Sequence, residues 1–154
     1  MNEPAATSST ALHRGIATQC NNAAWALIEQ PDLDAGERTE LVRLAATASY
    51  HWHVIGTPNN IAHADLLFSW ALARADAGPT AVDAARRALL HFTENQSQNW
   101  ERAFAHAAMA ISLHCNGDQD GHRRHYLEAK EFEASLASGD LKLFQAAFQN
   151  VPQP

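Results

Sequence analysis

Features that several functional classes require are scarce or missing in this sequence. Basic residues form no tract. The sequence has 11 Lys and Arg against 17 Asp and Glu, which gives a net charge of −6 at pH 7. A nucleic-acid-binding protein normally presents a basic face, so we expect no nucleic-acid partner. No apolar run approaches the length of a membrane span, and the N-terminus carries no apolar signal segment. These absences predict a cytoplasmic protein with no membrane partner.

Cysteines and catalytic motifs are equally scarce. Cys20 and Cys115 are the only cysteines, and without a paired metal spacing we expect them to be buried free thiols. The sequence has no Gly-x-Ser-x-Gly, phosphate-binding loop or His-Glu-x-x-His motif. His122 and His125 fall on one helical face, but a zinc site usually needs three or four ligands. We therefore expect no cofactor and no metal.

The composition favours helices. Alanine supplies 31 of the 154 residues, whereas there are only 4 Val and 5 Ile. Alanine is the best helix former, and β-branched residues favour strands. Small side chains also allow helices to approach closely. The sequence therefore predicts an all-α protein of stacked antiparallel helix pairs.

Helical periodicity and turn signals predict six main helices and a short C-terminal helix. The expected ranges are 9–29, 35–54, 58–77, 80–92, 99–116, 119–137 and 141–148. Residues 1–8 are predicted to be a flexible N-terminus, and residues 9–154 a single helical-repeat domain. The segment Ser138-Gly139-Asp140 is expected to break the chain before the last helix, which would cover the exposed end of the last pair.

Turn chemistry predicts where the third and fourth helices begin. Gly56 is expected to take the left-handed position after one helix. Thr57 is then expected to cap the next helix, with Pro58 in its first turn. Thr80 and Asp83 resemble a capping box at the start of the fourth helix.

The chain repeats itself. Segment 60–78 superimposes on segment 99–117, with Asn60 aligned to Asn99, and each segment ends in glycine before a second helix. A third pair is expected to turn at Gly36. A helix–turn–helix unit that recurs at this spacing is typical of a helical solenoid.

This pattern resembles tetratricopeptide repeats over about residues 35–137. Helix pairs, small residues where helices cross and glycine between helices carry the resemblance. The segment Tyr50-His51-Trp52, followed by Gly56-Thr57-Pro58-Asn59-Asn60, is similar to a stretch in uncharacterised bacterial helical-repeat proteins. The resemblance implies a tetratricopeptide-like superhelix and a bacterial source, and it implies no activity.

Polar and aromatic residues gather at the junction of the second and third helices. We predict that Trp52, His53, Asn60 and His63 line one cavity there, with His106 of the fifth helix as a further lining residue. A small anion would suit the N-terminus of the third helix, with histidine as an acid or base. The alternative is structural: a core tryptophan with each polar group paired inside the protein.

Two functional classes follow. Stacked helix pairs create an extended concave surface, which predicts a scaffold for a protein or peptide partner. A small-ligand-binding protein or an unfamiliar enzyme that uses the junction cavity is the alternative. Self-association into a homodimer through exposed end helices is a further possibility.

Overall fold

The computed structural model describes residues 3–154, with side chains from residue 8 onward. Over this range the chain forms seven α-helices and no strand. The helices are α1 (Glu3–Ile28), α2 (Ala35–Ile55), α3 (Pro58–Arg74), α4 (Gly78–Glu94), α5 (Asn99–Cys115), α6 (Gln119–Glu133) and α7 (Ser138–Phe148). The prediction of an all-α fold is confirmed. No helix of residues 3–154 combines the length and the apolar character that crossing a bilayer requires.

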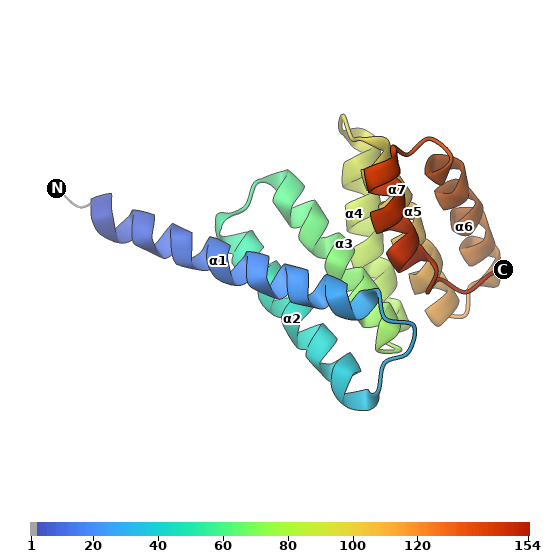
Figure 1. The fold of residues 1–154 in the computed structure, drawn as a ribbon, viewed down its shortest axis with the longest axis horizontal. Helices are drawn as coiled ribbons and strands as arrows, with labels where there is room; N and C mark the ends of the chain where they lie inside the picture. The colour runs from blue at the N-terminus through green and yellow to red at the C-terminus, as the bar shows by residue number, and fades with distance from the viewer. Residues whose placement is uncertain (1–2) are drawn as a thin grey trace.

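The helices stack in two rows (Figure 1). Each of the first six helices packs against its successor or predecessor in the chain, and α1, α3, α5 and α7 also pack on one another in that order. Helices α2, α4 and α6 contact mainly their neighbours in the chain. The odd-numbered helices therefore form a continuous row, and the molecule consists of antiparallel pairs laid side by side.

The structural repeat has a different register from the predicted one. The sequence comparison aligns Asn60 with Asn99, whereas the structure aligns the helix starts, Pro58 with Asn99 and Gly78 with Gln119. The left-handed turn residue after the first helix of each pair follows the structural register, at Asp76 (φ 61°) and Gly117 (φ 83°). The glycine alignment misled the sequence comparison because Asp76, not Gly78, is the equivalent of Gly117.

Several predicted boundaries are wrong. Helix α1 begins at Glu3, so part of the expected flexible N-terminus is helical, while residues 1–2 lie outside the described residues. The turn between α1 and α2 precedes Asp34, which caps α2, so Gly36 lies inside α2. Helix α4 starts at Gly78 with no side-chain cap, and Thr80 is already helical. The break before α7 falls at residues 134–137, and Ser138 opens that helix.

The core is built from alanines around a few large side chains. Trp70, Phe92 and Phe144 are fully buried. Phe144 of α7 meets Phe104 of α5 edge-on at a ring separation of 5.3 Å, which is a favourable aromatic geometry. Asn150 Nδ2 then donates a 2.9 Å hydrogen bond to the carbonyl of Ile28. Helix α7 therefore covers α5, as predicted for the terminal helix, and the segment after it is tied to the end of α1.

The junction between α2 and α3 shows why glycine occupies position 56. Gly56 has a φ of −82°, so the predicted left-handed conformation is wrong. A Cβ at this position would collide with the carbonyl oxygen of Trp52 and lie 2.9 Å from Cβ of Asn60. Glycine is needed because the ends of two helices approach closely here. This approach brings Trp52 and Asn60 together at the site described next.

Candidate functional site

One large cavity, open to solvent, is lined mainly by the odd-numbered helices. Its volume is about 500 Å³, within the usual range for small-ligand sites. Helices α1, α3, α5 and α7 supply most of its wall, and the end of α2 supplies one residue. The lining residues are Thr18, Asn21, Trp25, Glu29, Trp52, Asn60, His63, Leu66, Trp100, Phe104, Asp140 and Leu143.

Helix α1 forms one long wall of the cavity. Its lining residues Thr18, Asn21 and Trp25 are three or four positions apart, so they lie on one face of the helix. Glu29, which directly follows the last residue of α1, continues this wall. Eleven residues of helix correspond to about 16 Å, from the rise of about 1.5 Å per residue. The cavity is therefore elongated along α1 rather than round.

Aromatic rings dominate the walls. Trp25 and Trp100 each meet Phe104 edge-on, at ring separations of 5.6 Å and 6.3 Å. Trp52 lies within reach of no other aromatic ring among the described side chains. Three of the four tryptophans of the chain thus line one cavity, while the fourth, Trp70, is buried in the core beside Trp25.

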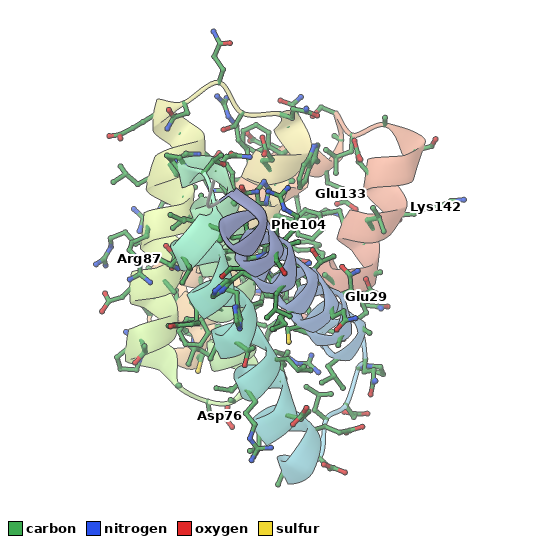
Figure 2. The ribbon with its side chains drawn as sticks, turned by 90° about the vertical axis from the view of Figure 1, so that its left-hand side faces the viewer. Glu29, Asp76, Arg87, Phe104, Glu133 and Lys142 are labelled. Carbon is green, nitrogen blue, oxygen red and sulfur yellow. The ribbon has the colours of Figure 1, made fainter. Side chains whose placement is uncertain are left out.

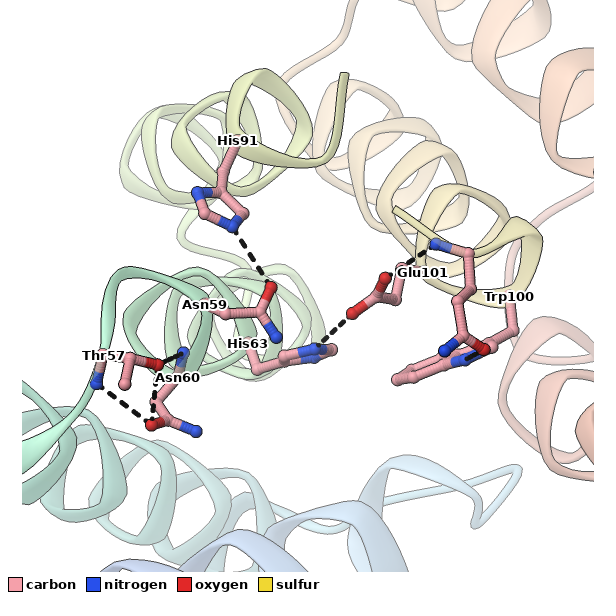
Figure 3. Close-up of polar contacts among 8 residues, drawn as sticks. Thr57, Asn59, Asn60, His63, His91, Trp100 and Glu101 are labelled. Carbon is pink, nitrogen blue, oxygen red and sulfur yellow. Dashed lines mark hydrogen bonds and ion pairs between the residues drawn. The ribbon is translucent and has the colours of Figure 1, made fainter. Parts of the chain in front are cut away.

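A histidine and a buried carboxylate meet at the wall between α3 and α5 (Figure 3). Nε2 of His63 lies 2.9 Å from Oε1 of Glu101, and Oε2 of Glu101 accepts a 2.9 Å hydrogen bond from the backbone N–H of Gln98. The imidazole stacks on the indole of Trp100 with a centroid separation of 5.3 Å and an angle of 20°. The carboxylate is held at both oxygens, so the imidazole is fixed in position against the cavity.

The first turn of α3 is closed by its own side chains. Thr57 Oγ1 accepts from the backbone N–H of Asn60, and Oδ1 of Asn60 accepts from the backbone N–H of Thr57 at 3.0 Å. The predicted cap at Thr57 and the predicted Pro58 in the first turn are confirmed. Nδ2 of Asn60 has no hydrogen-bond partner among the described residues, which leaves one amide donor at this end of the cavity.

The charged groups of the lining are all acidic. Glu29 comes from the turn that directly follows α1 and Asp140 from the first turn of α7, and the lining contains no Lys or Arg. The neighbouring Lys142 points away from the molecule (Figure 2). Within residues 8–154, no group of three His, Cys, Asp or Glu side chains is arranged to hold a metal ion.

Three of the five residues that were predicted to line a cavity lie together in the structure. Trp52, Asn60 and His63 line the cavity. His53 is exposed on α2, where its Nδ1 lies 2.8 Å from the carbonyl oxygen of Ser49. It was placed wrongly because residue 53 is one position, about 100° of helix rotation, beyond the inward-facing Trp52.

His106 is also outside the cavity. It lies between α5 and α6, with its Nδ1 3.0 Å from Nδ1 of His125 and its ring stacked on Phe132. Burial, and then the charge of Arg102, lower the pKa of His106. Burial and the nearby His106 lower the pKa of His125 to about 4. The pair packs two helices together and belongs to a different region from the cavity.

Sequence reasoning missed the most important wall residues, Trp25, Trp100 and Phe104. These side chains come from helices that are distant in sequence, and nothing local indicates that their faces meet. Glu101 was also missed, although its position in the sequence indicates a helix cap. It stands three positions after Gln98, where a capping glutamate is expected, and it is the counterpart of Asn60 when the starts of α3 and α5 are aligned.

Comparison with known proteins finds no match for this chain among protein families, curated proteins or solved structures. The functional argument therefore depends on the cavity and its residues.

Proposed function

We propose that this protein is a tetratricopeptide-like scaffold that binds a peptide segment of a protein partner in the cavity, along the wall formed by α1. The observation that carries the proposal is the elongated cavity lined by Trp25, Trp52 and Trp100. Large aromatic side chains dominate the energetics of recognition sites. The wall of about 16 Å along α1 matches about five residues of extended peptide, from the rise of each residue in a strand. The cytoplasmic location and bacterial source remain predictions.

A single substitution on α1 tests this proposal, with a matched control beside it. Asn21 lines the cavity, whereas Asn22 is exposed and lies outside the lining. A peptide library is selected against the parent, and the enriched peptides are then measured on Asn21→Trp and Asn22→Trp. We expect Asn21→Trp to weaken binding by at least about tenfold because an indole fills the groove, while Asn22→Trp binds as the parent does. Failure to enrich any peptide, or equal binding by both variants, would contradict the proposal.

The second candidate is a small-ligand-binding protein or an unfamiliar enzyme that uses the same cavity. The contact between His63 and Glu101 favours it, because a histidine oriented by a carboxylate is a common general base. Conversion of a bound ligand by the parent, lost in His63→Gln while binding is kept, would favour this candidate over the scaffold. Binding without conversion would favour the scaffold.

Self-association is a separate proposal, and it concerns the open end of the helix row. Leu12, Tyr50 and Val54 are each at least half exposed there, at 64%, 65% and 51%. Leu12 belongs to the N-terminal half of α1, and Tyr50 and Val54 belong to the last turns of α2. Figure 1 shows that α1 extends beyond α2 at its N-terminal end. Helices α1 and α2 begin the row and contact mainly each other and α3, so no further helix covers their outer side. A constant monomer mass in sedimentation equilibrium up to millimolar concentration would contradict a homodimer.

A further inference from the structure

The aromatic cavity carries negative charge that nothing neutralises. The side-chain carboxylates of Glu29 and Asp140 have no hydrogen-bond or ion-pair partner among the described residues. The only basic side chain of the lining is His63, and Glu101 lies against it at 2.9 Å. Even a protonated imidazole would therefore be matched by a carboxylate. The site as a whole offers aromatic faces and acidic groups.

These charges argue against the anion that the sequence suggested. An anion would use free N–H groups at the start of α3, but Thr57 Oγ1 already accepts from the N–H of Asn60. It would also approach the carboxylates of Glu29 and Asp140 without a Lys or Arg to compensate. A cation is instead attracted by the carboxylates of Glu29 and Asp140 and by the aromatic faces of the lining.

We propose that the cavity recognises an organic cation with an N-methylated ammonium group. The inference rests on the proposed function, because it assumes that the cavity is a binding site, and it names the chemistry of the ligand. Aromatic rings attract cations through their negative faces, and tryptophan does so best. A primary ammonium is strongly hydrated, and this mostly apolar wall would replace few of the hydrogen bonds that it gives up on leaving water. A methylated ammonium keeps the charge, sheds little water and presents methyl groups to Trp25, Trp52 and Trp100.

A pair of isosteric probes separates charge from shape. Choline carries a trimethylammonium group, and 3,3-dimethylbutan-1-ol has the same shape with a neutral carbon in place of nitrogen. Isothermal titration calorimetry on the full chain should show choline binding about tenfold more tightly, as expected for a desolvated cation–π site with nearby carboxylates. Equal affinity for both probes, or preference for the alcohol, would overturn the proposal.

Two sets of variants locate the binding. Asn21→Trp should abolish choline binding, and Asn22→Trp should leave it unchanged, since only Asn21 lines the cavity. The double variant Glu29→Gln/Asp140→Asn should weaken choline severalfold. Its control, Glu94→Gln/Glu131→Gln, removes the same number of charges from exposed positions outside the lining and should have little effect. Choline binding that survives Asn21→Trp, or that falls equally in both double variants, would overturn the proposal.

A further experiment distinguishes two sources of such a cation, a methylated peptide and a free small molecule. A short peptide with one trimethyl-lysine is compared with its unmethylated form and with choline. Tighter binding of the methylated peptide than of choline identifies a peptide as the source, and equal binding identifies a free small molecule. If selected peptides bind in a manner sensitive to Asn21→Trp but choline shows no advantage over the alcohol, the scaffold function stands and this inference fails. If neither peptides nor probes bind, both fail.

Discussion

Glu101 of α5 contacts both His63 of α3 and the backbone at the start of α5. One carboxylate oxygen lies 2.9 Å from Nε2 of His63, and the other accepts the backbone N–H of Gln98. Glu101→Ala should lower the free energy of unfolding by about 1–3 kcal/mol. The substitution removes a helix cap and leaves the half-buried imidazole of His63 without its carboxylate partner. Glu101→Gln keeps an acceptor for the cap and should lose less. Urea unfolding measures both, with Glu131→Ala on the exposed face of α6 as the control. Equal stability of Glu101→Ala and Glu131→Ala would contradict the account.

Glycine at position 56 is required by close approach. Gly56→Ala would place a Cβ against the fixed carbonyl oxygen of Trp52, and we expect a loss of about 1–3 kcal/mol from this overpacking. At Gly15 in α1 a Cβ meets nothing within 4 Å. Gly15→Ala should therefore stabilise the protein, by up to about 1 kcal/mol, since alanine favours the helix. In thermal unfolding, the midpoint should fall for Gly56→Ala and rise for Gly15→Ala. A rise for both variants would contradict the close approach of α2 and α3 at Gly56.

The pair of His106 and His125 predicts loss of stability in mild acid. Burial lowers the pKa of His125 to about 4 from an ordinary value of 6.5, so between these values the unfolded chain binds more protons. The contribution of His125 is complete above about pH 6.5 and is lost as the pH falls toward 4. Because the ring is only half-buried, solvent screening limits the effect to about 1–2 kcal/mol.

The measurement is the free energy of unfolding from about pH 7.5 to about pH 4. His125→Gln should flatten the decline relative to the parent, since the replacement does not titrate. His53→Gln, which changes an exposed imidazole on α2, is the control and should keep the slope of the parent. An identical slope for the parent and His125→Gln would refute the role assigned to this pair.

The sequence predicted the helices and one end of the cavity, and the physical reasons are specific. Thr57 and Pro58 determine the start of α3 through local chemistry, and this start brings Asn60 near Trp52. Trp25 and Trp100 escaped prediction because their meeting depends on how α1, α3 and α5 are stacked. Contacts between nonadjacent helices are set by packing of whole faces, which local periodicity does not encode.

The four tryptophans permit one direct test of whether the cavity is a binding site. Each indole N–H gives its own signal in a ¹⁵N-labelled NMR spectrum: Trp25, Trp52 and Trp100 report on the cavity, and Trp70 reports on the core. The protein is titrated with choline, 3,3-dimethylbutan-1-ol and the peptides selected from the library. We expect at least one ligand to shift the three cavity signals along a single saturation curve, with Trp70 shifting least and with no response in Asn21→Trp. Cavity signals that stay still for every ligand, or a response that persists in Asn21→Trp, would contradict it.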